Sequence, residues 1–380
     1  MLVVANHLCL VGVHKSREMR DASLIACDFE KELPTATFDS MSSDRHTDYT
    51  LPWVSVVVPT HDRPEVLWRL LESLRHLSYC HSRLELNVVG GDHDRGRKVV
   101  QAFGESVLFQ VNYRVVSNDV LHSASFKRNE GARFARGEIL AFTDDDCVVH
   151  PDWIIAALAY FRSPDVGGVE GAVDVPRPNR PTLTYRRSLR LSLPEGYQTC
   201  NMLYRKSVFE ECGGFDLAFP YYLEDTDLAY TVLERGYRIP FAAGAVVSHP
   251  VPPGNPLKMF TTARTVEQLP YLFRKHAKSR VKLKASATAL TKSHYAFLSL
   301  YGGVLLLFLV QPRTGAISLG IGLSTLMTLH LVHDFWGLRT TPRELALTAL
   351  CLPIIPVVRL FYFLKGLVLS HVEQVRARIS

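Results

Sequence analysis

The chain has 380 residues, of which 47% are hydrophobic by a broad count and 21% are charged. This apolar content excludes a disordered or collagen-like chain and is enough for two or three domain-sized units. The seven cysteines are scattered and form no C-x-x-C pair, which argues against a disulfide scaffold or a zinc ribbon and favours thiols in a reducing compartment.

The net charge of +6 comes from one part of the chain. No acidic residue lies between Gln268 and His333, whereas eight basic residues do, so the rest of the chain carries a charge of −2. The eight are Arg274, Lys275, Lys278, Arg280, Lys282, Lys284, Lys292 and Arg313. Most of them precede a hydrophobic run, which predicts a juxtamembrane segment that meets lipid and argues against a nucleic-acid partner. A solvated basic helix is the alternative.

Residues 1–50 show no lasting hydrophobic period and are predicted to form a poorly ordered segment or linker. The apolar stretch 1–13 is too short for a membrane span and lacks the preceding basic residues of a signal peptide. Met41 is an alternative start residue.

Strands and helices alternate from residue 53 onward. Apolar runs predict strands at 54–58, 84–89, 113–116 and 138–142, the second closed by Gly90 and Gly91. Leucines at helical spacing after Pro64, and a segment near 126–135, predict helices between them. This alternation predicts an α/β domain over 51–265, with an open sheet that binds its ligand at the carboxyl ends of the strands.

Three apolar stretches follow, at 294–310, 316–332 and 345–369. The first two have 17 residues each, which is the lower limit for a membrane span. The third contains Pro353 and Pro356, which predicts a broken span or an interfacial helix. We expect a basic juxtamembrane segment at 266–292, two to three transmembrane or interfacial helices at 293–370, and a tail at 371–380. A helix pair buried in a protein core is the alternative.

Three consecutive carboxylates, Asp144, Asp145 and Asp146, follow the fourth predicted strand. Like charges this close raise one another's pKa unless a cation compensates them. Mg²⁺ or Mn²⁺, held by one or two carboxylates together with substrate phosphates, would provide that cation. In the D-x-D spacing of Asp144 and Asp146, one acid can accept a sugar hydroxyl while the other binds the metal. A solvated acidic turn is the alternative.

A second acidic block, from Glu224 to Asp227, begins a predicted helix. The helix dipole favours ionised acids there, which is the state that a general base needs, although such acids often only stabilise the helix. His249 follows a predicted strand at 245–248 and is a candidate metal ligand, with a packed core histidine as the alternative.

In order and spacing, the motifs of residues 53–250 resemble the family 2 inverting glycosyltransferases of the GT-A fold. They are V-S-V-V-V-P-T-H-D-R, R-N-E-G-A, A-R-G-E-I-L-A-F-T-D-D-D, H-P-D-W, N-M-L-Y-R, G-G-F-D, E-D-T-D-L and R-G-Y-R-I. The resemblance implies a Rossmann-like open mixed sheet flanked by helices, and the apolar runs agree with a membrane-tethered member that has C-terminal transmembrane helices.

The resemblance also implies roles for individual residues. The nucleotide-sugar site would contain Pro59, Thr60, His61, Asp92, Arg128, Asp144 and Asp145. Asp144 would lie near the ribose or the sugar, Asp146 would hold the metal on the diphosphate, and Asp145 would share either task. Asp225, supported by Glu224, would be the base that helps an acceptor hydroxyl attack the anomeric carbon with inversion.

One segment departs from the family pattern. The family commonly has two acids after the second strand, one of which reads the base, whereas this chain has Gly90 and Gly91. Asp92 or Asp94 would have to substitute from a shifted position. The departure puts a uridine donor in doubt.

The expected partners are a nucleotide-sugar donor, a glycan or lipid-linked acceptor and membrane lipid, with Mg²⁺ or Mn²⁺ as cofactor. Nucleotide sugars are cytosolic and basic segments stay on the cytoplasmic side, so we expect a multi-pass protein of the cell membrane with a cytoplasmic catalytic domain. The alternatives are a polyprenyl-phosphate glycosyltransferase and a non-catalytic nucleotide-sugar-binding membrane module. A nucleotidyltransferase is disfavoured, because no Gly-rich basic phosphate loop follows the first strand.

Overall fold

The computed structural model describes residues 51–116, 123–179, 181–219, 222–251, 257–279, 291–335 and 341–379. All of them belong to one compact unit, Leu51–Ser380. The predictions for residues 1–50, and for Arg280, Lys282 and Lys284 of the basic segment, lie outside the described residues.

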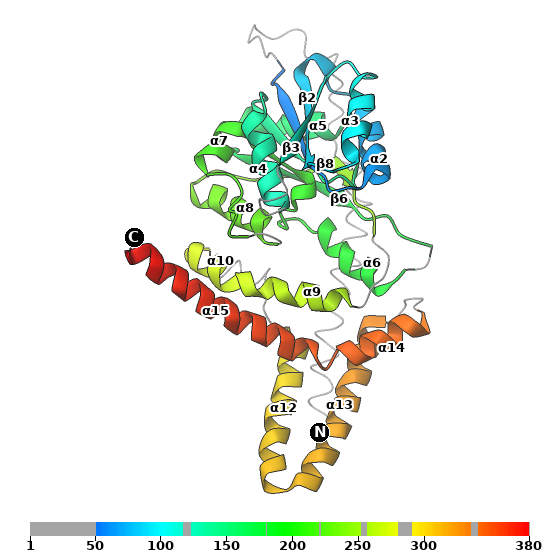
Figure 1. Cartoon of the computed structure of the whole chain (residues 1–380), viewed down its shortest axis with the longest axis vertical. Coiled ribbons are helices and arrows are strands. Elements are labelled where there is room, and N and C mark those ends of the chain that lie inside the picture. Colours follow the sequence, from blue (N-terminus) through cyan, green and yellow to red (C-terminus); the bar gives the residue numbers. More distant parts are fainter. Residues whose placement is uncertain are drawn as a thin grey trace. The chain divides into compact units, whose positions relative to one another are not determined.

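An eight-stranded mixed sheet forms the centre of residues 51–251, in the order β3-β2-β1-β4-β7-β6-β8-β5. Figure 1 shows this sheet above the C-terminal helices. The four predicted strands are parallel: β1 (Val54–Pro59), β2 (Leu84–Gly91), β3 (Gln110–Val116) and β4 (Ile139–Phe142). β2 and β3 lie on one side of β1, and β4 lies on the other. The strand order therefore reverses between β1 and β4, which is where open α/β sheets bind their ligands.

The remaining strands make the sheet mixed. β7 (Met202–Arg205) is antiparallel to β4 and to β6 (Gly168–Asp174), and β8 (Phe241–Ser248) is parallel to β6. The short β5 (Val148–Val149) pairs antiparallel with the end of β8, with Val148 opposite Ser248. This last pairing places the residues just before β5 beside those just after β8.

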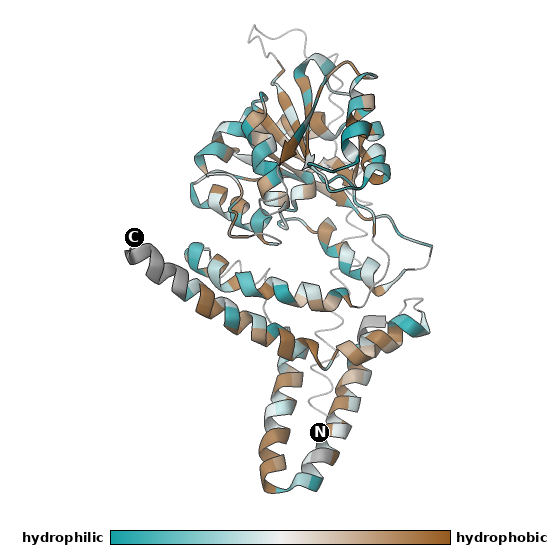
Figure 2. Ribbon diagram, viewed as in Figure 1, coloured by the Kyte–Doolittle hydropathy of each residue, from teal (hydrophilic) through white to brown (hydrophobic). Residues whose placement is uncertain are grey.

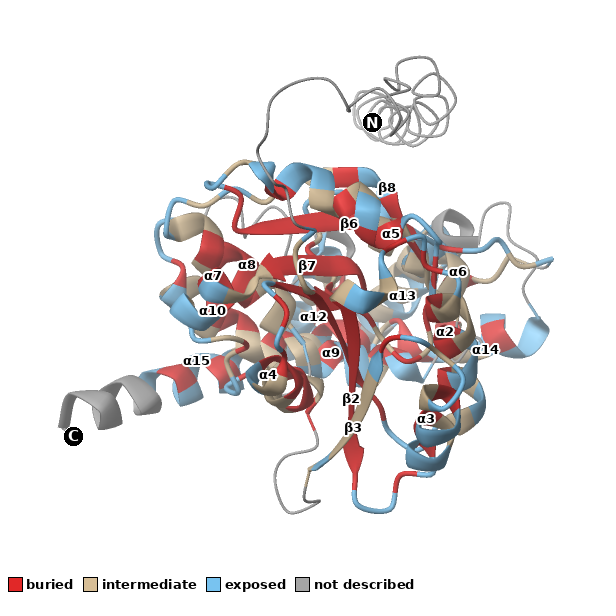
Figure 3. Ribbon diagram, turned by 90° about the horizontal axis from the view of Figure 1, so that it is seen from above, coloured by how far each residue is buried: buried red, intermediate tan, exposed pale blue. Residues whose placement is uncertain are grey.

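Helices cover both faces of the sheet, and Figure 3 shows the buried strands between them. One core contains α2 (Pro64–Arg75), α3 (Gly96–Gly104) and α5 (Trp153–Leu158), and the other contains α4 (Ala124–Phe134), α7 (Lys206–Glu211) and α8 (Glu224–Glu234). Successive residues of β1 point to opposite cores, since Val56 packs in the first and Val57 in the second. The shorter helices are η3 (His81–Arg83), η4 (Ala159–Arg162), α6 (Leu183–Ser188), η5 (Leu189–Ser192) and η6 (Thr199–Asn201).

The glycines that depart from the family pattern belong to β2. The prediction that this strand closes at Gly90 is wrong, because Gly90 and Gly91 pair with Val115 and Val116 of β3. A Cβ atom on Gly90 would overlap the hydroxyl of Tyr113 and lie 2.8 Å from Asp94 Oδ2. An acid cannot occupy this position while Tyr113 keeps its place.

The C-terminal region consists of helices. α9 (Lys258–Arg264), η7 (Thr265–Gln268) and α10 (Leu269–Lys275) are followed by α12 (Lys292–Val310), α13 (Pro312–Phe335), α14 (Pro342–Cys351) and α15 (Ile355–Ile379). α12 and α13 pack together as a hairpin, and α15 lies along α9, η7 and α10 (Figure 1). α15 also continues through the region predicted to be a tail.

Within the described residues, one segment, Pro312–Leu331, is long and apolar enough to cross a membrane. α14 and α15 qualify only as a pair bent by 50°, and the apolar part of α12 is shorter. Only 6% of the α13 segment is buried, which does not fit the alternative of a helix pair in a protein core. Figure 2 shows hydrophobic residues on the hairpin and along α15.

Candidate active site

A cleft of about 230 Å³ opens where β1 and β4 end. It is lined by Pro59, Thr60, His61, Arg63, Ala124, Lys127, Arg128, Asp144, Asp145, Asp146 and His249. The cleft therefore gathers every residue predicted for the nucleotide-sugar and metal sites except Asp92. Asp92 is exposed on the turn after β2 and is not among the lining residues.

Asp145 is the acid of the triplet that points into the protein. Its side chain is 1% exposed, and its Oδ2 accepts a hydrogen bond of 2.9 Å from the hydroxyl of Thr60. Burial raises the pKa of Asp145 to about 6, although the neighbouring guanidinium of Arg63 opposes this shift. Asp145 thus ties the segment after β1 to the segment after β4 and shapes the cleft between them. Its role toward the nucleotide sugar stays a prediction.

Arg128 joins the two acidic blocks. It lies on α4 with only 6% of its side chain exposed. Nη2 donates to Asp144 Oδ1 at 2.6 Å, and Nη1 donates to Glu224 Oε1 at 3.0 Å. Burial disfavours the charged guanidinium, but the two carboxylates outweigh it and raise the pKa of Arg128. The strand-end acids and the start of α8 therefore form one electrostatic unit.

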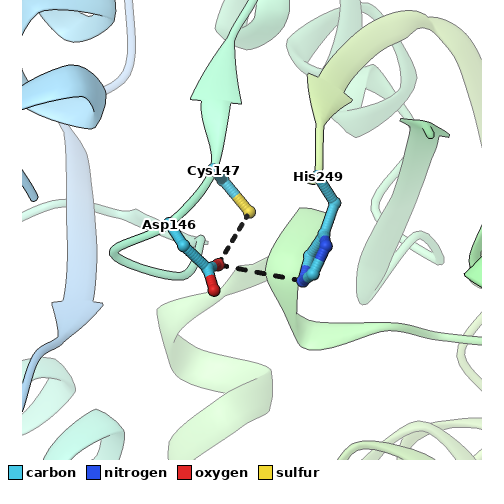
Figure 4. A group of neighbouring side chains, drawn as sticks. All are labelled: Asp146, Cys147 and His249. Carbon is cyan, nitrogen blue, oxygen red and sulfur yellow. Dashed lines mark hydrogen bonds and ion pairs between the residues drawn. The ribbon is translucent and has the colours of Figure 1, made fainter. Parts of the chain in front are cut away.

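Asp146, Cys147 and His249 form a cluster whose ligand atoms all lie within 4.8 Å of one another (Figure 4). His249 Nε2 is 3.8 Å from Asp146 Oδ1, and Cys147 Sγ is 4.0 Å from the same oxygen. The pairing of β5 with β8 brings these segments together across about a hundred residues of chain. A carboxylate and an imidazole this close fit two ligands of one divalent ion. Cys147 was not anticipated, and Asp144 pairs with Arg128 instead of joining this cluster.

Asp225 lies in the first turn of α8. Its Oδ1 accepts a hydrogen bond of 2.7 Å from the backbone N–H of Thr226. Burial and the adjacent charge of Glu224 raise the pKa of Asp225 to about 7. Burial and the like charge of Glu224 therefore act against the helix dipole, which favours the ionised acid.

The opposite side of α8 is fastened to α10. Asp227 accepts from Lys275 Nζ at 2.8 Å and faces His276 Nε2 at 2.9 Å, while His276 Nδ1 lies 2.9 Å from Glu234. The side chains of Asp227 and His276 are at most 2% exposed. Burial alone would lower the pKa of His276, but the hydrogen bonds to the two carboxylates outweigh it and raise that pKa. We call Asp227, Glu234, Lys275 and His276 the α8–α10 clamp.

The clamp corrects part of the juxtamembrane prediction. Lys275 is one of the bases that the sequence predicts to meet lipid, but it forms ion pairs of 2.8 Å with Asp216 and Asp227. Arg274 likewise donates to the carbonyl of Ser370 on α15. Lys275 and Arg274 therefore hold parts of the fold together, since their partners are two carboxylates and a backbone carbonyl. These partners lie far away in the chain, so the local sequence does not reveal them.

Lys127 and Arg63 were also missed as cleft residues, although both stand inside or beside quoted motifs. Lys127 is buried, and its Nζ donates to the carbonyl of Thr60 at 2.6 Å. Asp94, considered as a substitute base reader, accepts from the backbone N–H groups of Asp62 at 3.0 Å and Gly96 at 2.7 Å. The side chains of Lys127 and Asp94 therefore both hold the loop after β1 in place, and this loop forms one wall of the cleft.

Comparisons with known proteins agree with this geometry. Residues 52–265 match the family described as "Glycosyltransferase like family 2". Glycosyltransferase AglE of Haloferax volcanii is 26% identical over 215 residues, which cover 54% of this chain and 69% of AglE. The glucosyl-dolichyl phosphate glucuronosyltransferase of the same organism is 33% identical over 126 residues, covering 32% of this chain and 38% of that protein.

Among solved structures, the chain is similar to the mannosyltransferase PcManGT from Pyrobaculum calidifontis, determined in complex with GDP-Man and Mn²⁺. The TM-score is 0.54 at 18% identity, covering 82% of this chain and 87% of that chain. This likeness confirms the predicted fold class, an open mixed sheet flanked by helices.

Proposed function

Because the chain belongs to glycosyltransferase family 2, we propose that it transfers a sugar from a nucleoside-diphosphate sugar to an acceptor hydroxyl, with inversion and with the help of a divalent metal. One observation carries the proposal. Arg128 lines the cleft and bridges Asp144, next to Asp146, to Glu224, next to Asp225. Glu224 and Asp225 are not among the lining residues of the cleft, so this bridge is what connects the candidate base to the candidate donor site.

Several basic groups line the cleft, where we place the nucleotide-sugar donor. Arg63, Lys127 and Arg128 line it, and Asp146 and His249 are the residues that would hold the metal. A bound divalent ion would neutralise charge on the departing nucleoside diphosphate. Arg63 pairs with Asp145 and, at 3.1 Å, with Asp146. A metal ion on Asp146 would leave one nitrogen of the guanidinium available to a phosphate while Asp145 holds the other. His61 is exposed at the cleft, where it can stack on a base.

The donor set favours Mn²⁺ over Mg²⁺. Mg²⁺ prefers oxygen ligands in near-ideal octahedral geometry, whereas an imidazole suits the later transition metals better. His249 supplies such an imidazole beside Asp146. The PcManGT complex, which contains Mn²⁺ together with GDP-Man, supports this choice.

Asp225 is the group that we assign as general base. A base works best when its pKa lies near the working pH, because it is then both available and strong enough to take the acceptor proton. Its raised pKa of about 7 meets this condition, whereas an ordinary aspartate would be a weaker base.

We infer a lipid-linked acceptor and a location at the cytoplasmic face of a membrane. The apolar α12–α13 hairpin and the name of the glucuronosyltransferase relative, which refers to a dolichyl phosphate, support this assignment. A second candidate is transfer to a polyprenyl phosphate itself. A phosphate acceptor needs no strong base, so this candidate predicts that Asp225 is dispensable.

The test measures release of nucleoside diphosphate by the detergent-solubilised full chain with UDP- and GDP-sugars, in Mn²⁺, Mg²⁺ or chelator, together with calorimetry of donor binding. We expect Asp146→Asn to lose metal-dependent donor binding. Asp225→Asn should keep donor binding but lose transfer. Full transfer by a correctly folded Asp225→Asn variant would support the phosphate-acceptor candidate, and metal-independent donor binding would refute the metal assignment.

A further inference from the structure

Helix α15 carries a continuous apolar stripe on its exposed side. The stripe starts at Ile354, just before the helix, and continues at spacings of three and four residues through Val357, Phe361, Leu364 and Val368. Each of these side chains is between 48% and 64% exposed. Residues at this spacing lie on one face of a helix, so the exposed apolar atoms form a line along α15 as far as Val368.

The opposite face of α15 is already occupied. The backbone at Gly366 approaches the carbonyl of Glu267 in η7 so closely that a Cβ atom would overlap it. Lys365 Nζ also forms an ion pair of 2.8 Å with the carboxylate of Glu267. Nearer the start of α15, Ile355 and Val358 pack against the side chains of α9. The helix is therefore fixed to the layer formed by α9, η7 and α10. Its apolar stripe faces outward, together with Lys365, Leu367 and Leu369, which are each 43–44% exposed.

The exposed apolar surface continues from α15 onto the α12–α13 hairpin. The hydroxyl of Tyr301 on α12 donates to the carbonyl of Pro353 at 2.6 Å and joins the hairpin to the start of α15. Leu305, Leu309 and Val310 of α12 are between 62% and 78% exposed. α13 contains the segment that is long enough to cross a bilayer. Lipid hydrocarbon can cover the exposed apolar faces of α15 and of the hairpin at the same time, because it adapts to any shape. A protein partner would need one surface that fits both faces.

We propose that α15 lies in the interface of a lipid bilayer as an amphipathic helix and does not cross it, while the hairpin inserts. Along its length α15 packs against α9, η7 and α10, which carry Lys258, Glu267 and Lys275. A spanning orientation would draw these charges into hydrocarbon, which is costly. Lys365 stays 43% exposed although it pairs with Glu267, so its ammonium group can still reach the headgroup region.

The proposal goes beyond sugar transfer and does not depend on which sugar is used. It also places α10 between the bilayer and α8, because α10 packs on α15 and ends at Lys275, with His276 of the α8–α10 clamp directly after it. The helix with Asp225 is therefore two packed helices away from the lipid surface. This arrangement would present the cleft to an acceptor whose lipid tail stays in the bilayer.

Depth-resolved quenching tests the proposal on the full chain in phospholipid vesicles. Tryptophan is placed singly at Val357, Phe361, Leu364 and Val368, and quenching by lipids brominated near the headgroup or deep in the acyl chain is compared after subtraction of the parent's signal. An interfacial helix predicts one shallow depth for all four positions. A spanning helix predicts a graded depth, since residues 357 and 368 are about 16 Å apart along a helix.

Tyr362→Trp is the matched control, because Tyr362 is partly buried and packs against the second core. It should be quenched less than Phe361→Trp, its neighbour on the stripe. Phe361→Trp exchanges one exposed aromatic for another, and an unchanged melting temperature shows that it is folded. Graded depths, or no quenching at any stripe position in vesicles that hold the protein, would overturn the proposal.

Discussion

The pH dependence of transfer is the most direct test of the role of Asp225. The structure raises the pKa of this acid from 3.8 to about 7 through burial and the neighbouring charge of Glu224. A general base acts only when it is deprotonated, so kcat/KM should rise with pH across this value. An aspartate with an ordinary pKa would be ionised throughout the neutral range and would give a flat profile.

The size of the effect follows from the ionised fraction. With a pKa of about 7, the carboxylate is about 9% ionised at pH 6 and about 91% at pH 8, so the rate should rise about tenfold between them. Glu224→Gln removes the like charge and leaves Arg128 without one of its two carboxylate partners. Both changes favour the ionised form of Asp225, so the rise should move to lower pH.

The assay follows the release of nucleoside diphosphate at low substrate concentration from pH 5.5 to 8.5. Ionic strength is fixed, the metal is saturating, and rates are measured in two buffers wherever their pH ranges overlap. The position of the rise is compared between the parent chain and Glu224→Gln. Glu210→Gln, which changes an exposed acid on α7, is the matched control and should leave the profile in place.

Two outcomes would refute this reasoning. A profile that is flat between pH 6 and 8 would mean that no group with the pKa of Asp225 limits transfer. A shift of the rise to higher pH in Glu224→Gln would mean that Glu224 does not raise the pKa of Asp225. Any residual activity of Asp225→Asn should be independent of pH across the same interval.

Two further predictions concern the helices beneath the site. His276→Ala leaves the buried Asp227 with one partner fewer and should lower the free energy of unfolding by about 3 kcal/mol, measured by thermal or denaturant unfolding in detergent. Folding raises the pKa of His276 above 6.5, so the stabilisation that charged His276 gives the folded protein is fully present below pH 6.5 and is lost as the pH rises through the pKa of the folded state. A loss of unfolding free energy in His276→Ala that grows with pH would contradict this. Gly366→Ala should push α15 away from Glu267 and lower the free energy of unfolding by about 1–3 kcal/mol. Gly320→Ala is the control, because nothing lies within 4 Å of its new methyl group, and it should not destabilise the chain. Equal effects of the two substitutions would refute the close approach of Gly366 to Glu267.

Local sequence determined the elements and the positions of the acids. Buried parallel strands read as short apolar runs, so β1 and β4 could be predicted from residues 54–58 and 138–142 with no knowledge of their neighbours. The strand-end position of Asp144 follows from the same pattern. The acidic start of α8 and the break at Pro353 are local signals as well.

The tertiary structure decided what each polar side chain touches. Which acid of the triplet turns inward, which arginine joins the acidic blocks, and whether Lys275 meets lipid or Asp227 all depend on segments far apart in the chain. His249 reaches Asp146 only through the register of β5 against β8. Hydrophobic periodicity shows which face of an element is buried, but long-range strand pairing and helix packing determine what that face meets, and the raised pKa of Asp225 depends on that environment.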